Sequence, residues 1–465
     1  MTINKLPNEV LIEIFDFYVA YPLPPPSDEK DEDAWHTLVH VCRRWRCVVF
    51  ASPCRLDLRL FCVDRRLAKT LDIWPELPIV IHVGDHRMRQ LPSVTDVISV
   101  LKRHNRVCKI FIDTVPNSFL EEVATTSEPL PALIELELVS FNEDAPTVPD
   151  SFLGGSVPSL RRLTSWGIRF PAIGKLLLST RDLVTLSLGF FRTSGYTSPE
   201  SMVAILSALT SLKSLHLRFE PPEFWTHGAS QRPPALTRVV LPALTKFDFS
   251  GDSEYLEDMV SRIDAPLEYI AVAFDGLLFD IPLLRDFIGR TQVLNAPHRA
   301  DTSFSNRDAR ISLFQRKGDV DFMVLYLEIR CDLSGSQFSL LAQACNSLLP
   351  TLPSLEHLRM YKSEDLASQW QHEVELTQWM ELFRPFIALK DLVLDEQAVL
   401  SVSSALQELV GERVTEILPA LQNIFLEDFL LSSTVPEGIG DLIAARELSG
   451  RPIIVHHEKK KLWLY

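Results

Sequence analysis

Cysteine is scarce in this chain of 465 residues, and its seven copies are scattered along the sequence. No Cys-x-x-Cys pair occurs, so the sequence supports neither a zinc ribbon nor a framework of disulfides. The odd count fits a reducing compartment inside the cell. We therefore expect the protein to reside in the cytoplasm, in the nucleus or in both.

Long apolar runs are also missing. No window of about 18 residues is both apolar and uncharged, which argues against a membrane span. The chain begins Met-Thr-Ile-Asn-Lys-Leu-Pro-Asn-Glu, with a proline and an acid where a signal peptide needs an apolar stretch. These two absences predict a protein with no membrane partner.

Basic charge is in deficit. The chain has 46 Lys and Arg against 61 Asp and Glu, a formal net charge of −15. Non-specific binding to nucleic acid depends on neutralising phosphates, so this balance argues against a nucleic-acid partner. We interpret the acidity chiefly as a means of staying soluble, with attraction of a basic partner as the alternative.

Signatures of catalysis are missing as well, among them Gly-x-Ser-x-Gly, the phosphate-binding Gly-x-x-x-x-Gly-Lys-Ser/Thr and His-Glu-x-x-His. Gly438-Ile439-Gly440-Asp441 is expected to lie in a loop and continues into no nucleotide fingerprint. His456 and His457 are adjacent and should point apart, a poor metal site. We therefore expect no catalytic residue, no metal and no cofactor, although a site assembled from distant segments stays open.

Two apolar-striped helical segments occupy the first sixty residues. Pro7 stands where a helix can begin, because the first turn offers no acceptor for the N–H that proline lacks. Apolar residues then recur at three- and four-residue steps, which places them on one helical face. They are Leu6, Val10, Leu11, Ile14, Phe15 and Tyr18 in the first segment, and Trp35, Leu38, Val41, Cys42, Trp45 and Val48 in a second that runs to Phe50. Two such helices expose more apolar surface than they can bury against each other, which predicts a binding partner.

The residues of this helix pair resemble the F-box family. Leu-Pro-x-Glu-x-Leu-x-x-Ile-Phe, beginning at Leu6, resembles the opening of an F-box, and Leu-x-x-Val-Cys-Arg-Arg-Trp-Arg, beginning at Leu38, resembles its second half. The resemblance covers about residues 4 to 60 and implies binding to the SKP-type adaptor of a cullin–RING ubiquitin ligase. The residues that would fill the adaptor groove or hold the box together are Leu6, Pro7, Val10, Leu11, Ile14, Phe15, Leu38, Val41, Cys42 and Trp45.

The connection between the two helices departs from the family pattern. Residues 21–33 contain four prolines followed by a run of acids, which predicts a solvated loop inserted into the box. Length added to a surface loop costs little closure entropy, so adaptor binding need not be lost. We assign residues 1–62 to the F-box, and two buried helices of a larger helical domain are the alternative.

A phrase of the form Leu-x-x-Leu-x-Leu recurs through the rest of the chain. Successive copies begin 23 to 34 residues apart, apart from one gap of 55. The copies begin at Val107, Leu133, Leu160, Leu183, Leu212, Leu244, Leu267, Phe322, Leu355, Leu389 and Leu421. The gap of 55 is about two periods, which predicts one degenerate repeat near Val293 to Phe304.

The last two apolar positions of each copy lie two residues apart, so they point to one side of a short strand. Amphipathic stretches between the copies predict helices at 94–101, 198–209, 281–288, 338–349, 376–386 and 399–410. This succession resembles irregular leucine-rich repeats, whose units bury their apolar faces only by stacking. We therefore predict an α/β fold, with a leucine-rich-repeat-like solenoid over residues 63–465.

In such a solenoid the residue between the last two apolar positions faces the concave side. These residues are Glu137, Thr164, Ser187, His216, Asp248, Ala271, Tyr326, Arg359, Val393 and Phe425. The set becomes more apolar and aromatic toward its end, which suits a protein or peptide ligand, whereas a merely solvated sheet face is the alternative. Aromatic side chains in loops after the strands are a second group. Together, the candidates for binding a target are Tyr326, Arg359, Phe425, Phe190, Phe191, Phe224 and Trp225.

Taken together, the chain resembles F-box proteins with irregular leucine-rich repeats, of the kind abundant in fungi. This resemblance implies a substrate receptor of an SCF-type ubiquitin ligase, with the box on the adaptor and the repeats on a protein target. Two alternatives stay open: an adaptor-binding scaffold outside ubiquitin transfer, and a repeat protein with an unrecognised enzymatic site.

Overall fold

A computed structural model describes most of the chain, in two compact units. The described residues are 6–20, 34–53, 55–56, 58–62, 71, 76–84, 93–113, 115–126, 128–142, 144–190, 197–219, 238–275, 281–291, 297–305, 308–330, 337–349, 352–362, 376–407, 416–427 and 435–458. Unit 1 comprises Met1–Thr197 and Ala208–Leu212, and unit 2 comprises Ser198–Ser207 and Lys213–Tyr465.

Unit 1 begins with three short helices, α1 (Asn8–Ala20), α2 (Ala34–Val41) and α3 (Arg43–Phe50), which pack against one another. The prediction of two helices was wrong in its second half. Cys42 has an extended backbone, with φ −160° and ψ 167°, and so separates α2 from α3. The predicted loop at 21–33 lies outside the described residues.

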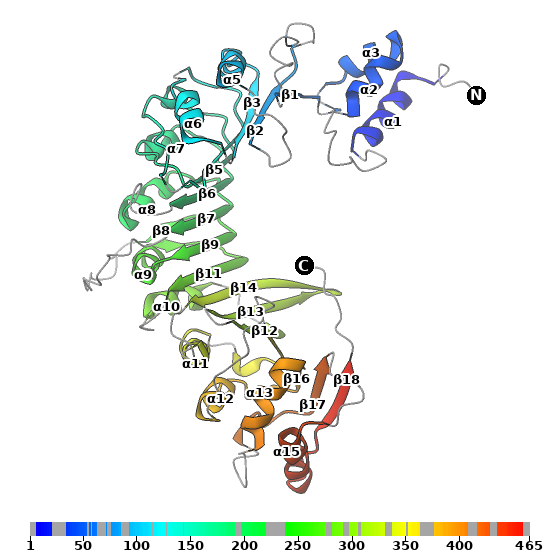
Figure 1. Ribbon diagram of the computed structural model, residues 1–465, viewed down its shortest axis with the longest axis vertical. Coiled ribbons are helices and arrows are strands. Elements are labelled where there is room, and N and C mark those ends of the chain that lie inside the picture. Colours follow the sequence, from blue (N-terminus) through cyan, green and yellow to red (C-terminus); the bar gives the residue numbers. More distant parts are fainter. Residues whose placement is uncertain are drawn as a thin grey trace. The chain divides into compact units, whose positions relative to one another are not determined.

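The rest of unit 1 is a sheet of parallel strands in sequence order. The strands are β1 (Leu60–Cys62), β2 (Ile79–Val83), β3 (Val107–Ile112), β4 (Glu135–Val139), β5 (Arg162–Trp166) and β6 (Thr185–Phe190). Helices α5 (Val94–Leu101), α6 (Asn117–Ala124) and α7 (Ile173–Leu178) lie along one side of these strands, and a 3₁₀ turn, η2, spans Phe152–Gly155 (Figure 1).

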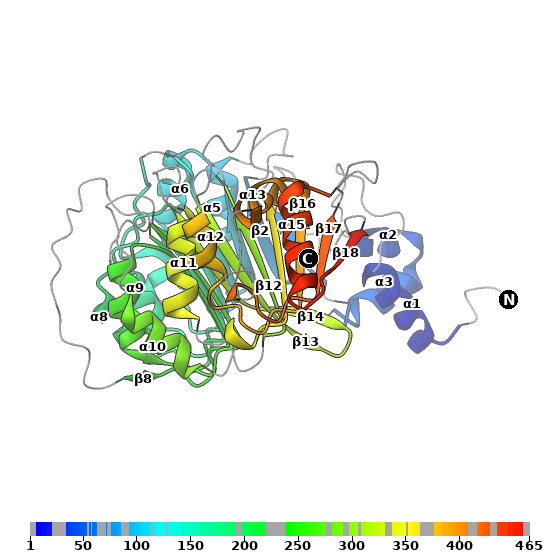
Figure 2. The same cartoon turned by 90° about the horizontal axis from the view of Figure 1, so that it is seen from below.

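Unit 2 continues the same strand–helix succession. Its first elements are α8 (Pro199–Ser207), β7 (Ser214–Phe219), β9 (Lys246–Gly251), α9 (Ser253–Ser261), β11 (Tyr269–Asp275) and α10 (Pro282–Arg290). Strands β7, β9 and β11 are parallel neighbours, and β8 (Val239–Val240) pairs with β10 (Ile263–Asp264) in a separate small sheet. Helices α8, α9, α10 and α11 line one side of the unit 2 strands (Figure 2).

The middle of unit 2 overturns the prediction of one degenerate repeat. Strands β12 (Arg299–Phe304), β13 (Asp308–Lys317) and β14 (Val320–Arg330) form an antiparallel meander. The meander enters the sheet in reverse, in the order β11-β14-β13-β12-β15, so the strand that contains Phe322 lies next to β11 rather than next to β15. The tight turn after Lys317 uses Gly318 at φ +65°, a conformation that favours glycine.

The parallel succession resumes after the meander. The elements are α11 (Gln337–Leu348), the 3₁₀ turn η4 (Leu352–Ser354), β15 (His357–Lys362), α12 (Leu376–Phe383), β16 (Asp391–Asp395), α13 (Glu396–Gln407), β17 (Asn423–Glu427), α15 (Glu437–Leu448) and β18 (Ile454–Glu458). Strands β15 to β18 pair in sequence order. The repeat pattern missed β1, β2, β8, β10, β13 and β18, as well as α6, α7, α9 and α15.

The repeated apolar positions form the core on the helix side of the strands. Leu136 and Leu138 of β4, and Phe247 and Phe249 of β9, are all 0% exposed. Burial of such side chains contributes about 1.5–3 kcal/mol each. The predicted succession of strands with helices is therefore confirmed. Ser198 caps α8, because the backbone N–H of Ser201 donates to its Oγ at 3.2 Å.

Gly438 and Gly440 lie inside helix α15, so their prediction as loop residues was wrong. A Cβ added at Gly438 would stand 2.0 Å from the carbonyl oxygen of Ser403 on α13, whereas one added at Gly440 would meet no atom within 4 Å. Gly438 therefore permits the close packing of α15 on α13.

We predict opposite effects for the two glycines. Gly438→Ala should lower the free energy of unfolding by about 1–3 kcal/mol, because α15 must move away from α13. Gly440→Ala should raise it by up to about 1 kcal/mol through helix propensity. Thermal unfolding of both variants measures the difference, and equal shifts for the two would contradict the assigned packing.

Candidate functional site

The start of α1 is held in place by α3. The backbone N–H of Leu11 donates to the carbonyl of Pro7 at 3.1 Å, which closes the first turn. Arg44 of α3 donates to the carbonyl of Leu6 and, at 2.9 Å, to Oδ1 of Asn8. Arg44 thus fixes the segment that leads into α1.

Three of the ten predicted adaptor residues form the interior of the three-helix bundle. Leu11, Phe15 and Leu38 are 0%, 1% and 5% exposed. The ring of Phe15 lies 4.8 Å from that of Trp45, centroid to centroid, at an interplanar angle of 56°. Trp45 is half-buried, as are Leu6 and Cys42. These side chains hold the helices together.

Cys42 caps α3, because its Sγ accepts a hydrogen bond from the backbone N–H of Trp45 at 3.4 Å. Arg46 donates through Nε to the carbonyl of Val39 at 2.9 Å, which satisfies an acceptor in the last turn of α2. The Cys-Arg-Arg-Trp-Arg stretch therefore supplies the local contacts that set α2 and α3 as separate helices.

An exposed apolar stripe runs along the outer side of α1. It consists of Pro7, Val10, Ile14 and Phe17, at steps of three, four and three residues, so it occupies one helical face. Val10, Ile14 and Phe17 are 40%, 43% and 63% exposed. Val41 on α2 is also exposed, at 55%. The stripe on α1 is therefore the candidate interaction site of the bundle.

Phe17 was missed by the sequence analysis, which treated Val10, Leu11, Ile14 and Phe15 as one face. The structure divides that face into an inner pair, Leu11 and Phe15, and an outer series that continues to Phe17. The three-residue step from Ile14 to Phe17 was the available signal.

The second candidate site is the side of the sheets that carries no helices. The residues expected there lie at matching register positions on neighbouring strands. In unit 1, Glu137, Thr164 and Ser187 are partners. In unit 2, His216, Asp248, Ala271 and Tyr326 are successive partners, and Arg359, Val393 and Phe425 are another series. The meander inserts Ser312 and Asp301 between Tyr326 and Arg359.

Not all predicted target-binding residues fall on described parts of the chain. Tyr326, Arg359 and Phe425 lie on β14, β15 and β17, and Phe190 is the last residue of β6. Phe191, Phe224 and Trp225 lie outside the described residues. The helix-free side of unit 2 is thus the part of this prediction whose geometry is defined.

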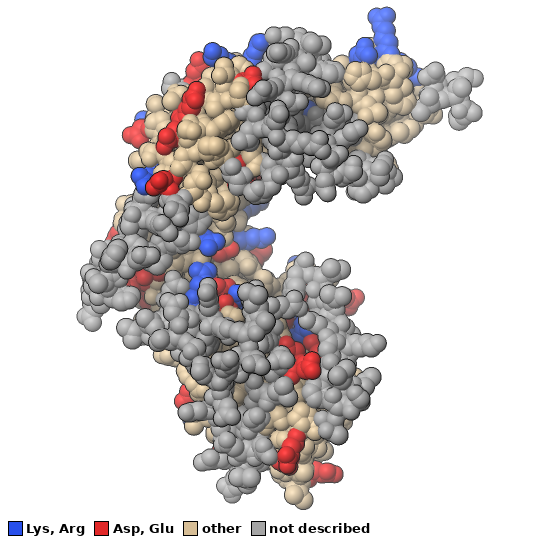
Figure 3. Space-filling view, viewed as in Figure 1, with Lys and Arg blue, Asp and Glu red and all other residues tan. Residues whose placement is uncertain are grey.

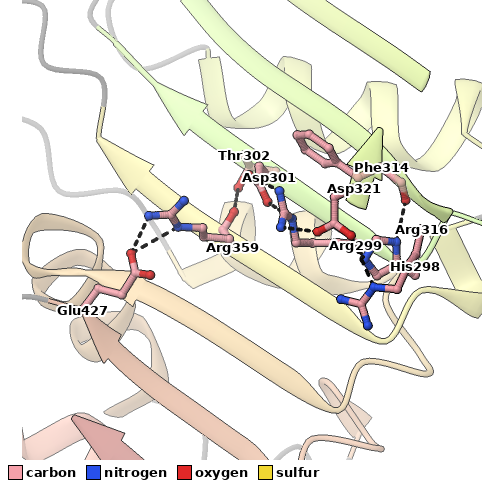
Figure 4. A network of polar contacts seen from close by, with 9 residues as sticks. All are labelled: His298, Arg299, Asp301, Thr302, Phe314, Arg316, Asp321, Arg359 and Glu427. Atoms are coloured by element: carbon pink, nitrogen blue, oxygen red, sulfur yellow. Dashed lines mark hydrogen bonds and ion pairs between the residues drawn. The ribbon is translucent and has the colours of Figure 1, made fainter. Parts of the chain in front are cut away.

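Arg359 forms an ion pair with Glu427 on this side of the sheet. It reaches from β15 to β17, where Nη2 lies 2.6 Å and Nε 3.2 Å from Oε2 of Glu427 (Figure 4). Arg359 and Glu427 are 9% and 6% exposed. Because the guanidinium and the carboxylate neutralise each other out of water, Arg359 contributes to the sheet more than to an open charged surface.

Tyr326 is similarly engaged. Its hydroxyl donates to Oε2 of Glu328 at 2.6 Å, and burial, reinforced by Glu328, raises the pKa of Tyr326 well above its ordinary value. Burial alone would raise the pKa of Glu328, but hydrogen bonds from Tyr326 and Arg330 outweigh it and lower that pKa. Tyr326 therefore stays protonated and Glu328 ionised.

The base of the meander carries a further polar cluster around the carboxylate of Asp321. Arg299, His298 and Arg316 approach it at 2.8, 3.2 and 3.3 Å (Figure 4). The guanidinium of Arg299 also lies 4.3 Å from the ring centroid of Phe314. Burial lowers the pKa of His298, against the raising effect of Asp321. One carboxylate thus joins β12 to both strands of the hairpin.

Across the described segments, no group of three or more His, Cys, Asp or Glu side chains is placed to hold a metal ion. His456 instead stacks on Phe425, with ring centroids 4.7 Å apart. Within the same segments, no helix is both long and apolar enough to cross a membrane.

Comparison with known proteins bears chiefly on the helical bundle. The family model described as F-box-like matches residues 3–55, so the chain carries an F-box-like domain at its N-terminus. Among curated proteins, none matches the chain.

Solved structures that this chain matches include that of a leucine-rich repeat-containing protein, LegL7 from Legionella pneumophila. It is 15% identical, with a TM-score of 0.27, and the match covers 78% of this chain and 95% of that one. Another is the complex of Rad7 and Elc1 in yeast, at 13% identity and a TM-score of 0.33, covering 92% of this chain and 91% of that one.

Truncation of a side chain on the inner side of α1 should destabilise the bundle more than truncation of one on its outer side. Leu11→Ala should lower the free energy of unfolding of the bundle by about 2–5 kcal/mol, because it opens a cavity at a fully buried position. Val10→Ala should change it by less than about 0.5 kcal/mol. Hydrogen exchange of the α1 amides measures both, and equal protection in the two variants would contradict the assignment of sides.

The pair Arg359 and Glu427 predicts non-additive mutational effects. Arg359→Met should destabilise unit 2 by roughly 3 kcal/mol, because it leaves the carboxylate of Glu427 buried without a partner. The double variant Arg359→Met with Glu427→Leu should recover most of that loss. Chemical denaturation of the single and double variants measures the coupling, and strictly additive losses would refute it.

Proposed function

We propose that this chain is a substrate-receptor subunit of an SCF-type cullin–RING ubiquitin ligase. In this proposal the N-terminal box, residues 1–62, binds a SKP-type adaptor, and the repeats of residues 63–465 bind a protein target. The observation that carries the proposal is the match of residues 3–55 to the F-box-like family, on a bundle whose first helix displays apolar side chains.

The outer stripe of α1 supplies the adaptor contact in this proposal. Val10, Ile14 and Phe17 retain 40% to 63% of their surface, which a partner can remove from water. Burial of apolar surface contributes about 25 cal/mol for each Å². Leu11, Phe15 and Leu38 act indirectly, because their packing keeps α1 in the position that presents the stripe.

The chain contributes proximity rather than chemistry. A target held on the repeats lies near the ubiquitin carrier that the ligase recruits, so attack by a target lysine becomes an effectively local reaction. This role requires no catalytic residue, metal or cofactor in the chain. It does require two separate surfaces, and the α1 stripe and the helix-free side of the sheets provide them.

Co-expression of the full chain with a SKP-type adaptor, followed by size-exclusion chromatography, tests the adaptor contact. The unmodified chain should elute as a one-to-one complex. Ile14→Asp should weaken binding at least about tenfold, because a charge placed in a buried apolar contact must be desolvated.

Leu178→Asp on α7 is the matched control, since Leu178 is an exposed apolar residue outside the box, at 59%. This variant should retain the adaptor. Failure of the unmodified chain to bind would refute the proposal, whereas binding of adaptor without recruitment of a cullin would indicate a scaffold outside ubiquitin transfer.

A further inference from the structure

The last three strands of unit 2 present an ordered grid of side chains on their helix-free side. We name it the β16–β18 face. It consists of Asp391, Val393 and Asp395 on β16, Asn423, Phe425 and Glu427 on β17, and Ile454 and His456 on β18. Alternation along each strand places these residues on one side, because Leu392, Leu394, Ile424 and Leu426, which lie between them, are buried in the core.

The register of the three strands sorts this grid into rows. Asp391, Asn423 and Ile454 form the first row, and Val393, Phe425 and His456 form the second. The third row contains Asp395 and Glu427. An apolar and aromatic row therefore lies beside the carboxyl ends of the strands, where Glu427 is buried and paired with Arg359 and Oδ1 of Asp395 accepts from the backbone N–H of Ala398 at 2.8 Å.

The apolar part extends to the outer strand. The rings of Phe425 and His456 are stacked, with centroids 4.7 Å apart and an interplanar angle of 16°. Ile454 lies two residues before His456 and is 59% exposed. An exposed isoleucine next to a stacked aromatic pair offers apolar surface to a ligand along β18.

β18 also has one unpaired edge. The backbone N–H of Ile454 donates to the carbonyl of Gln422 at 2.9 Å, toward β17. In a parallel pair, alternate residues point their N–H and C=O groups the other way, so Val455 and His457 direct theirs to the outer edge. In the part of the chain that the structure describes, β18 pairs with β17 alone. Such an edge is a template for an added strand.

The charge of this end of unit 2 is negative. Residues 376–465 contain 13 Asp and Glu against 8 Lys and Arg, a net charge of −5 out of the −15 of the whole chain. Asp and Glu side chains are visible over the end of unit 2 that holds β16–β18 and α15 (Figure 3). Arg359 and Glu427 neutralise each other, so this pair adds no net charge to the face. A ligand that complements the charge around the β16–β18 face is therefore basic.

We propose that the β16–β18 face docks an extended, basic segment of a partner protein, which adds to the edge of β18 as a further strand. Alternate apolar side chains of that segment lie against Ile454 and His456, and its Lys or Arg side chains complement the net negative charge of this end of unit 2. This inference rests on the proposed function, since it assigns the chemical class of the target segment.

The test uses the full chain and a fluorescein-labelled seven-residue peptide, Lys-Val-Lys-Leu-Lys-Val-Lys, with fluorescence polarisation as the readout. The peptide should bind, and replacing its central Leu with Pro should weaken binding about tenfold, because proline lacks the N–H that a ladder requires. A peptide of the same composition with its four Lys grouped at one end should also bind more weakly. Equal binding of all three peptides would mean attraction by charge alone and would overturn the proposal.

Three variants of the protein test whether the peptide binds at the edge of β18. His457→Pro removes one outward N–H at an edge position that tolerates proline, and Ile454→Lys reverses the chemistry of the patch; each should weaken binding about tenfold. Val240→Lys is the control, because Val240 is 65% exposed and belongs to the separate sheet of β8 and β10. It should bind as the unmodified chain does, and a loss equal to that of Ile454→Lys would overturn the proposal.

Two further measurements separate the remaining outcomes. Residues 459–465, Lys-Lys-Lys-Leu-Trp-Leu-Tyr, have the same basic and apolar composition. If the peptide binds only after their removal, the occupant is the chain's own end and a partner segment is refuted. Adaptor binding by His457→Pro and Ile454→Lys should be unchanged, so failure of the peptide to bind a chain that retains the adaptor refutes this inference alone.

Discussion

Burial of one row of leucine and phenylalanine side chains per strand is the constraint on which the repeats depend. A single strand with its helix cannot cover that row, so each repeat needs a neighbour on both sides. Stacking then fixes the register of the strands, because a slip of one residue would turn every buried side chain outward. The residues between the buried positions are in turn forced onto the helix-free side, whatever their chemistry.

On that helix-free side, the named charged and polar side chains form ion pairs and hydrogen bonds with one another. Arg359 pairs with Glu427 across β16, Tyr326 donates to Glu328, and Asp321 gathers Arg299, His298 and Arg316. Buried charges cost free energy unless they are paired in this way. The charged side chains named here, in the middle of unit 2, are therefore largely compensated by one another. The same separation between inner and outer sides occurs on α1, where Leu11 and Phe15 face the bundle and Val10, Ile14 and Phe17 face water.

Sequence patterns located those strands whose position depends only on the spacing of neighbouring residues. The phrase Leu-x-x-Leu-x-Leu located most strands, because its last two apolar positions match the two-residue period of a strand. The same argument failed at residues 299–330, where Phe322, Leu325 and Leu327 were assigned to an ordinary repeat. Gly318-Asp319 between two alternating segments was a hairpin signal that the period of the repeats concealed. Cys42 similarly interrupts a helical pattern without any glycine or proline to mark the break.

The sequence by itself determined which positions of the repeats face the core, most of the strands and helices between residues 94 and 427, and the resemblance of the first sixty residues to an F-box, because each of these depends on the spacing of neighbouring residues. Only the tertiary structure decided that the meander enters the sheet in reverse, that Arg359 meets Glu427 sixty-eight residues away, and that Gly438 lies in a helix against Ser403. The reason is physical: strand direction, partner choice and close backbone approach depend on contacts between segments distant in the chain, and a local pattern does not encode them.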